Sequence, residues 1–320
     1  MSTQLVGFVG LGALGTHMAR NLALHRATAG LSPLLIWNRT VAKSQKLAED
    51  LGLNKVRVAE TLEDLATECD VVITNLANDA VSKDVYGVFV KAVKASAPKS
   101  RIFVETSTIH PSFATELKTL ITALPSTQFV ASPVFGSPPV AEKAQLILLM
   151  SGEPEPVKEI SSILCPAVGA KVLEMGEDIE KAPTLKLIGN SFILGSLEIL
   201  AECQTLAEKT GLGAQGAQNL AKIFYTPPLC AYGDKMLNHA FDGSQGFSLN
   251  GGIKDATHVQ SLAKTHGTPM PALEAARVHL VKAREIHERE IAVGKSGVGV
   301  LDVASLVTAV REEAGVAKNH

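Results

Sequence analysis

Short apolar runs rich in β-branched residues alternate with helical patterns over the first half of the chain. Such runs, bounded by turn residues, are typical of buried strands. Between them, apolar positions recur at the helical period over residues 13–25, 41–51 and 111–124, with Thr40 and Thr61 at N-cap positions. The alternation predicts an α/β fold with a doubly wound parallel sheet of the Rossmann type. The candidate strands are residues 5–9, 34–37, 55–58, 71–74, 101–104, 128–131, 146–150 and 171–174.

The strand pattern ends near Glu180. Residues 182–209 keep a helical period for longer than an ordinary helix, until Gly211 and Gly213 stop it. Helical patterns follow over residues 213–224, 253–265, 270–294 and 303–314, separated by turns rich in Gly and Pro at residues 226–228, 243–252 and 294–299. We therefore predict an α/β domain over residues 1–180 and an all-α domain over residues 181–320, joined by the long helix.

Composition excludes several classes of protein. A chain of 320 residues with 46% hydrophobic residues can bury two cores and is not disordered. Its 30 basic and 32 acidic residues give a net charge of −2 without a run of either sign, so no nucleic-acid partner is expected. The most apolar stretches are too short, or too interrupted by polar residues, to span a membrane. A small-molecule substrate is the expected partner.

The spacing of the cysteines and histidines also bears on the class of protein. The four cysteines form no Cys-x-x-Cys pair and the chain starts without a signal-peptide pattern, which predicts a cytoplasmic protein. The nine histidines show no metal-ligand spacing, so no metal is expected.

A glycine-rich turn follows the first candidate strand and opens the first helix. Gly10 permits the tight turn, Gly12 lets the backbone approach a pyrophosphate, and Gly15 lets helix and strand pack closely. Phosphates are attracted to the free N–H groups and the dipole at such a helix start. The order of strand, turn and helix predicts that residues 1–180 bind a dinucleotide through Gly10, Leu11, Gly12, Ala13, Leu14 and Gly15.

The end of the second strand decides which dinucleotide is bound. A carboxylate there would accept hydrogen bonds from the ribose of NAD, but this chain has Asn38, Arg39 and Thr40. Arg39 and the Thr40 hydroxyl can bind a 2′-phosphate, so we predict NADP, with NADPH preferred over NADH. The alternative is that Arg39 is a solvated loop residue.

These motifs together resemble the β-hydroxyacid dehydrogenases, which include 3-hydroxyisobutyrate dehydrogenase and glyoxylate or succinic semialdehyde reductases and are related to 6-phosphogluconate dehydrogenase. The resemblance runs nearly end to end, from the opening residues 7–22 through the fourth strand and its loop at residues 70–79. It implies that Leu76, Ala77 and Asn78 border the nicotinamide.

Two further blocks resemble the family's substrate-binding elements. Thr106, Ser107 and Thr108 lie in a stretch similar to its Asp-x-Ser-Thr element. The resemblance implies that Thr106 contacts the cofactor, and that Ser107, Thr108 and the backbone after Ser107 hold the substrate's polar head. A helix cap before Pro111 is the alternative reading. Residues 132–137 occupy the place of its Pro-Val-Ser-Gly-Gly loop. There Phe135 replaces a serine and Ser137 replaces a glycine, while Gly136 is kept, so the pocket is expected to suit a different substrate.

A fourth block resembles the family's catalytic Lys and Asn. Lys186 and Asn190 are four residues apart in the long helix, so both lie on one helical face. From the residues alone, a Lys186 that extends from the helix into water is the favoured reading. The resemblance implies instead that Lys186 is the general acid and base and that Asn190 orients the substrate or the lysine.

The last block lies in the all-α domain. Phe247 and Lys254-Asp255 resemble the family's Phe-x-Leu and Lys-Asp elements, which implies that Phe247 and Lys254 lie on the cofactor side of the cleft. A surface ion pair between Lys254 and Asp255 is the alternative.

We therefore expect an NAD(P)-dependent dehydrogenase or reductase that interconverts a small aldehyde or keto acid and its hydroxy acid. Two alternatives remain, an imine reductase-like enzyme and a non-catalytic NADP-binding scaffold. The resemblance also implies a homodimer formed through the long helix and the helical domain.

Overall fold

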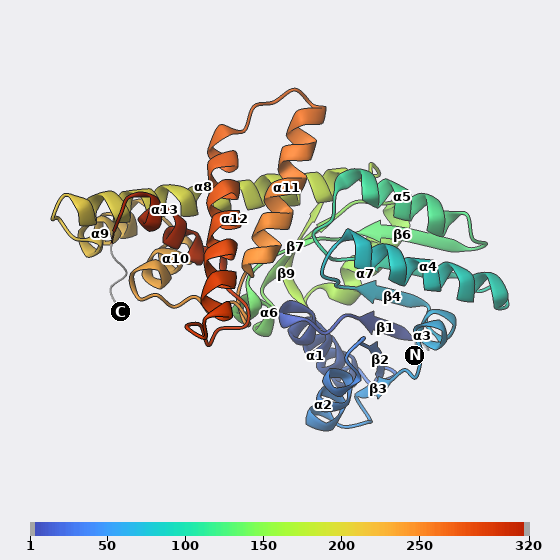
Figure 1. Cartoon of the computed structure of the whole chain (residues 1–320). Helices are drawn as coiled ribbons and strands as arrows, with labels where there is room; N and C mark the ends of the chain where they lie inside the picture. Colours follow the sequence, from blue (N-terminus) through green and yellow to red (C-terminus); the bar gives the residue numbers. More distant parts are fainter. Residues whose placement is uncertain (1–3, 317–320) are drawn as a thin grey trace. The chain divides into compact units, whose positions relative to one another are not determined.

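A computed structural model describes residues 4–316, and the chain divides into two compact units, Met1–Lys186 and Leu187–His320. Within the described residues, the first unit contains a six-stranded parallel sheet in the order β3-β2-β1-β4-β5-β6 (Figure 1). The order reverses between β1 and β4, where doubly wound sheets bind their ligands. The predicted Rossmann-type sheet is therefore confirmed. Its strands are β1 Val6–Val9, β2 Leu34–Trp37, β3 Val56–Val58, β4 Val71–Thr74, β5 Arg101–Glu105 and β6 Thr127–Ala131.

A smaller sheet holds the last two candidate strands, β8 Leu146–Met150 and β9 Gly169–Glu174. These two strands run parallel, but β8 also pairs with the antiparallel strand β7, Val134–Phe135. The expectation of a single parallel sheet was wrong here, and β7 was missed because two residues carry no period.

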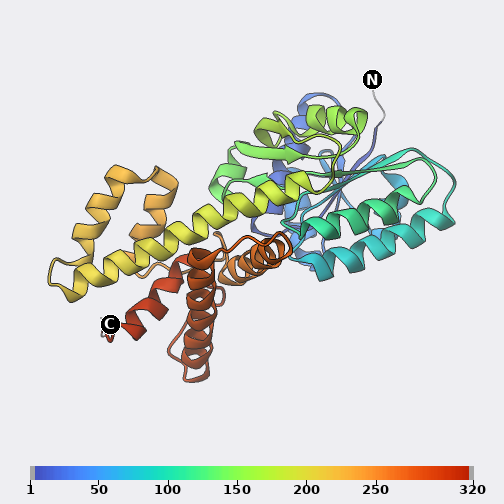
Figure 2. The same cartoon turned by 90° about the horizontal axis from the view of Figure 1, so that it is seen from above.

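Helices cover both faces of the large sheet because its strands bury alternate residues on opposite sides. Val71 and Ile73 of β4 join one core and Val72 joins the other. In Figure 2, α4 and α5 lie side by side along one face of the sheet. The first core receives α1 Ala13–Thr28, α2 Val41–Leu51, α6 Pro138–Glu142 and α7 Pro154–Leu164, and the second receives α3 Leu62–Glu68, α4 Asp79–Ala95 and α5 Pro111–Thr122.

The second unit is helical in its described residues. The long helix α8, Lys181–Lys209, begins in the first unit and continues into the second, as predicted. By length and composition alone, α8 is also apolar enough to cross a bilayer, a test that core helices of soluble proteins pass as well. The remaining elements are α9 Ala214–Phe224, α10 Pro227–Leu237, α11 Leu249–Thr265, α12 Pro271–Ala292, the 3₁₀ helix η1 Val303–Leu306, and α13 Val307–Glu313.

Helix α10 corrects the sequence analysis, which treated Thr226 to Pro228 as a turn. Thr226 is the N-cap of α10, and Pro227 and Pro228 occupy its first turn. Proline is tolerated there because the first N–H groups of a helix have no intrahelical acceptor.

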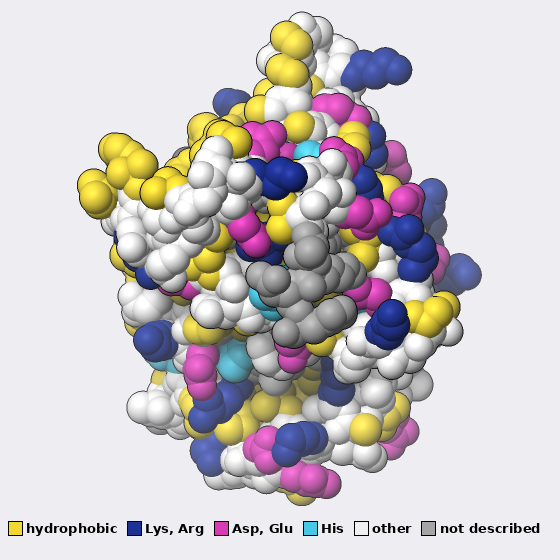
Figure 3. All heavy atoms as spheres, turned by 60° about the vertical axis from the view of Figure 1, so that its left-hand side comes forward, with side chains coloured by type: hydrophobic (Ala, Val, Ile, Leu, Met, Phe, Trp, Pro, Cys, Tyr) yellow, Lys and Arg dark blue, Asp and Glu magenta, His cyan; other side chains and the backbone are white. Residues whose placement is uncertain are grey.

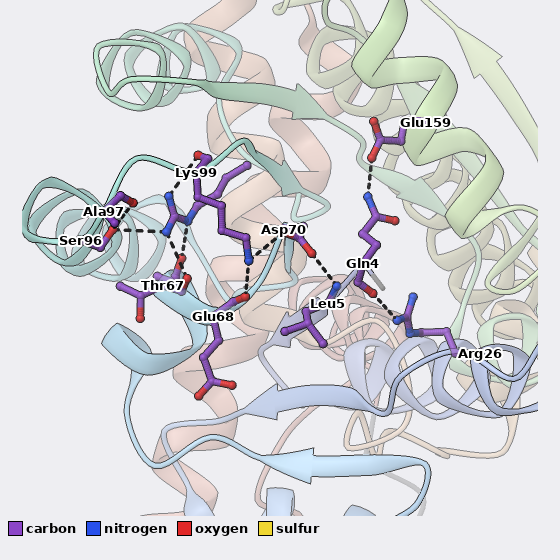
Figure 4. Close-up of polar contacts among 12 residues, drawn as sticks. Gln4, Leu5, Arg26, Thr67, Glu68, Asp70, Ser96, Ala97, Lys99 and Glu159 are labelled. Carbon is purple, nitrogen blue, oxygen red and sulfur yellow. Dashed lines mark hydrogen bonds and ion pairs between the residues drawn. The ribbon is translucent and has the colours of Figure 1, made fainter. Parts of the chain in front are cut away.

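The amino-terminal edge of the large sheet is closed by a polar network (Figure 4). Arg101, only 2% exposed, donates to the Ala66, Thr67 and Lys99 carbonyls and to the Ser96 hydroxyl. Lys99 pairs with Asp70 at 2.7 Å, and the other Asp70 oxygen accepts the Leu5 N–H. The charged groups of this edge thus form the hydrogen bonds and the ion pair that join strands to helices.

Candidate active site

The glycine turn lies at the opposite, carboxyl-terminal edge of the sheet. Gly10 has a φ of +102°, and a Cβ on it would lie 2.2 Å from the Asn75 carbonyl oxygen. A Cβ on Gly15 would lie 2.1 Å from the Gly10 oxygen. The first and third glycines are therefore required by the fold itself.

Gly12 differs from these two glycines. Apart from its own chain neighbours, no atom of residues 4–316 lies within 4 Å of the position where its Cβ would stand, and no side chain caps α1 there. The start of α1, which includes Ala13 and Leu14, thus faces open space with free N–H groups. This geometry fits a dinucleotide pyrophosphate.

Asn38 braces this turn. Its side-chain oxygen accepts the Leu11 N–H at 2.9 Å, and its amide donates to the Thr40 carbonyl at 3.0 Å. The structure therefore joins the end of β2 to the glycine turn through Asn38. This brace orients the backbone that a cofactor would contact.

Arg39 and Thr40 are exposed just beyond β2. Within residues 4–316, Arg39 has no carboxylate partner, and the Thr40 side chain makes no capping bond to α2. Thr61, by contrast, caps α3 by accepting the Asp64 N–H, as predicted. Both predicted contacts for a 2′-phosphate lie at one end of β2.

The loops after β4 and β5 are hydrogen-bonded to each other. The Leu76 N–H donates to the Ser107 hydroxyl at 2.6 Å, and the Thr106 hydroxyl donates to the Thr74 carbonyl at 2.6 Å. Asn75 donates to Thr106 at 3.0 Å. The structure thus brings the predicted nicotinamide loop and substrate loop together.

Asn78 and Ala77 complete the first of these loops. The Asn78 side chain caps α4 by accepting the Val81 N–H at 3.0 Å. The helix cap just before Pro111 is His110, whose ring nitrogen accepts the Ser112 N–H. Ser107 and Thr108, the residues considered from the sequence, are not the cap of this helix.

A buried carboxyl group lies behind Ser107. Glu105, 1% exposed, accepts the Ser107 N–H at 2.8 Å, while its second oxygen has no hydrogen-bond partner in the described residues. Burial raises the pKa of Glu105, although hydrogen bonds from the Ser107 hydroxyl and N–H act in the opposite direction. The Ser107 hydroxyl is therefore already engaged on both sides, which sequence reasoning missed because burial of Glu105 depends on packing.

Phe135 ends β7 and Gly136 turns the chain away from it. Gly136 has a φ of +140°, and a Cβ there would lie 2.5 Å from Leu146. Ser137 follows at the N-cap of α6 without a side-chain capping bond. The Ser137 hydroxyl is thus exposed, two residues beyond Phe135.

Lys186 lies against this loop. Its side chain belongs to the first turns of α8, is only 9% exposed, and places Nζ 4.2 Å from the centre of the Phe135 ring. The alternative that Lys186 extends into water does not describe this structure. The substrate loop and the candidate catalytic lysine meet within the first unit.

A second cluster lies in the helical unit. The Asn190 amide donates to Asp255 at 2.6 Å, and the other Asp255 oxygen lies 3.2 Å from Lys254 Nζ. The Lys254 side chain is 19% exposed and that of Asp255 4%, so this pair is not a surface ion pair. Phe247 is half-buried in the core of this unit. Asp255 thus connects two predicted site residues.

Among residues 4–316, no group of three His, Cys, Asp or Glu side chains is arranged to hold a metal ion. The polar groups of the described site are backbone N–H groups, hydroxyls, amides and amines, together with the buried carboxyls of Glu105 and Asp255. These groups suit a phosphate-bearing organic cofactor and a polar organic substrate.

Comparisons with known proteins show the family of the chain. Residues 5–176 match the family described as the NAD binding domain of 6-phosphogluconate dehydrogenase. The chain is 28% identical over 305 residues to NADH-dependent oxidoreductase ucdB of Aspergillus ustus, covering 95% of this chain and 98% of the relative. It is 26% identical over 309 residues to glyoxylate/succinic semialdehyde reductase 1 of Arabidopsis thaliana, covering 96% and 98% of the two chains.

A solved structure is also similar. The 3-hydroxyisobutyrate dehydrogenase of Mycobacterium tuberculosis, solved with L-serine, superposes with a TM-score of 0.76 at 22% identity. The match covers 97% of this chain and 100% of that one. At this identity the likeness shows the shared fold.

Proposed function

The chain belongs to the family of the NAD binding domain of 6-phosphogluconate dehydrogenase and is an oxidoreductase of the β-hydroxyacid dehydrogenase type, and from this premise we propose that it reduces a small aldehyde or keto acid to the hydroxy acid with NADPH. The observation that carries the proposal is the near-complete burial of Lys186, whose amine lies 4.2 Å from the centre of the Phe135 ring in the substrate loop. A lysine removed from water in this way is held in one place, as a proton donor must be.

Each part of the site has a role in this reaction. The N–H groups at the start of α1 hold the pyrophosphate of the cofactor, and the loop Leu76 to Asn78 borders its nicotinamide. When bound, the reduced nicotinamide supplies a hydride. One N–H bond of the Lys186 ammonium breaks, and its proton goes to the carbonyl oxygen that receives the electron pair of the C=O bond. Water then reprotonates the amine.

The remaining residues orient the substrate. Asn190 positions the reacting oxygen or the lysine, and Asp255 fixes the Asn190 amide. Thr108 and the N–H groups around Gly136 bind the far end of the substrate. Ser107 aids them by fixing the loop, because its hydroxyl is engaged with Leu76 and Glu105.

Replacing the lysine tests this assignment. We expect Lys186→Ala to lower kcat for carbonyl reduction about 10³-fold, because the proton donor is lost. The dissociation constant for NADPH, measured by nucleotide fluorescence, should stay unchanged. Lys181→Ala, an exposed lysine at the start of the same helix, is the matched control. A near-normal rate for Lys186→Ala would contradict the proposal.

The preference for NADPH rests on Arg39 and Thr40. Since the relative from Aspergillus ustus is named NADH-dependent, the two cofactors must be compared directly. We expect Arg39→Ala to weaken NADPH binding about 10-fold and leave NADH binding unchanged, because only NADPH carries the 2′-phosphate. Lys46→Ala, an exposed lysine of α2, is the control. Equal losses for both cofactors would contradict the preference.

One assay separates the alternatives. NADPH oxidation is followed with glyoxylate, succinic semialdehyde, methylmalonate semialdehyde, larger aldehydes and cyclic imines. Turnover of carbonyls supports the proposal, whereas turnover of imines alone would make the protein imine reductase-like. NADPH binding without any turnover would indicate the scaffold.

We also propose a homodimer formed through the helical unit. Large apolar side chains of α8 stay exposed at spacings of four and seven residues, which makes one stripe along the helix. Figure 3, which brings the side of α9 forward, shows hydrophobic side chains gathered in raised patches on that face. The stripe consists of Ile188, Phe192, Ile199 and Leu206, and Leu212, Leu220, Ile223 and Phe224 extend the exposed apolar surface toward α9.

A second copy is the proposed occupant because two such stripes can pack against each other about a two-fold axis. We expect light scattering to show a dimer for the wild type and a monomer for Phe192→Glu with Ile223→Glu. Leu53→Glu, at a 72% exposed leucine of the first unit, is the control. A wild-type monomer would contradict the dimer.

The proposal also includes a soluble, cytoplasmic enzyme. All four cysteines are free, which suits a reducing compartment. Cell fractionation tests the location, and recovery in a membrane pellet would contradict it.

A further inference from the structure

The contact between Lys186 and Phe135 extends the proposed function. The resembling family usually carries a serine where this chain has Phe135, and here the lysine amine lies over an aromatic ring. We propose that Phe135 is a positioning residue, whose ring face holds the Lys186 ammonium in place as the proton donor. This inference rests on the proposed function, and it concerns residues of the first unit alone.

The ring is fixed by its backbone. Phe135 pairs with Ile147 in the antiparallel ladder of β7 and β8, and Val134 pairs with Leu148. Gly136 then takes a φ of +140° in a space where a Cβ would lie 2.5 Å from Leu146. Strand pairing on one side and a tight turn on the other fix the backbone that carries the ring.

The amine is fixed by the start of α8. The Ala182 N–H donates to the Ser151 hydroxyl at 2.9 Å, and Ser151 is fully buried at the end of β8. Ala182 is itself fully buried. The helix turn that carries Lys186 is therefore held on the same small sheet that carries the ring.

The face of a phenyl ring is negative, so it attracts an ammonium group and not a neutral amine. A lysine side chain has four carbons and many conformations, and the ring selects among them while the amine carries its proton. Once an N–H bond has broken and the proton has moved to the substrate oxygen, the attraction is lost. Reprotonation by water restores it, so the ring holds the lysine in the state that begins each turnover.

Fluorinated phenylalanines test this inference. Placing 4-fluoro-, 3,5-difluoro- and 3,4,5-trifluorophenylalanine at position 135 reduces the negative charge of the ring face stepwise with little change of shape. We expect kcat for reduction to fall stepwise, by about 10-fold over the series, with little change in KM. The same residues at position 113, a buried phenylalanine of α5, should leave kcat unchanged.

Natural substitutions give a second measurement. Phe135→Tyr keeps the aromatic face and should stay within about 2-fold of the wild-type kcat, whereas Phe135→Leu keeps apolar bulk and should lose about 10-fold. A flat fluorination series would overturn the inference even if Phe135→Leu were impaired, since packing alone would then explain the loss.

The variant Lys186→Ala separates this inference from the proposed function. In that background the residual rate should no longer respond to fluorination at position 135, and a remaining slope would overturn the role of the ring. Loss of turnover in Lys186→Ala together with a flat fluorination series would leave the proposed function intact and remove only the inference. Full turnover in Lys186→Ala would remove both.

Discussion

The two edges of the large sheet in the first unit use polar groups in opposite ways. At the amino-terminal edge, Arg101 uses its guanidinium on three carbonyls and one hydroxyl, and Lys99 pairs with Asp70 (Figure 4). At the carboxyl-terminal edge, Gly12 faces open space and Glu105 keeps one oxygen without a hydrogen bond in the described residues.

This difference separates structural polarity from polarity that serves a ligand. Buried donors and acceptors are normally satisfied within the protein, so a network that is complete leaves nothing for a ligand. Open N–H groups are tolerated where something else is bound. The comparison predicts that substitutions in the amino-terminal network change stability alone, and that at the other edge a change at Gly12, which faces open space, alters binding.

The largest effect is expected within the glycine turn itself. Gly15→Ala places a Cβ 2.1 Å from the Gly10 oxygen and should lower the free energy of unfolding by more than about 3 kcal/mol.

Gly12→Ala enters open space, so its stability should stay within about 1 kcal/mol while NADPH affinity falls about 10- to 100-fold. Urea unfolding and nucleotide fluorescence measure the two. Wild-type affinity in Gly12→Ala would place the phosphates elsewhere.

The next effect belongs to the amino-terminal edge. Arg101→Met removes the donors of several buried carbonyls and should lower the free energy of unfolding by about 2–3 kcal/mol. The folded variant should bind NADPH as the wild type does, because the network lies at the far end of the strands. Weaker binding in the folded variant would break the comparison between the edges.

Glu105 should make stability depend on pH. Burial raises the pKa of Glu105 above its ordinary 4.5, so the folded protein keeps this proton at a pH where the unfolded chain has lost it. The stabilisation that protonated Glu105 contributes is complete below the ordinary pKa of 4.5. It is lost as the pH rises through the raised pKa of the folded state. Glu105→Gln should remove that decline in urea unfolding measured from pH 4 upward, while Glu60→Gln, at an exposed carboxyl, should keep it. Parallel profiles for Glu105→Gln and the wild type would refute the prediction.

The smallest effect is expected at Lys99. Its ion pair with Asp70 is about one-third exposed, so Lys99→Ala should cost only about 0.5 kcal/mol in low salt and less in high salt. The Leu5 N–H still binds Asp70 in the variant. A loss as large as that of Arg101→Met would show that the pair matters more than its exposure implies.

The sequence predicted the elements that carry a long local pattern. The strands 34–37, 71–74 and 146–150 and the helix Val41–Leu51 were placed at their observed ends, and the order of strand, Gly10–Gly15 turn and helix indicated the dinucleotide site. Strand β7 and helix α10 were not predicted, since two residues carry no period and two prolines suggested a turn.

The same limit applies to the site. Spacing put Lys186 and Asn190 on one helical face, and the resemblance supplied their roles. Neither could show that Lys186 lies over Phe135, or that Ser107 is held by Leu76 and Glu105.

Local order along the chain thus determined the fold class, the glycine turn and the face of the long helix, because period and turn chemistry act between near neighbours. Only the tertiary structure decided which side chains are buried together and which hydrogen bonds remain open. Those outcomes depend on strand register and helix packing between residues far apart in sequence, where no local pattern records the contact.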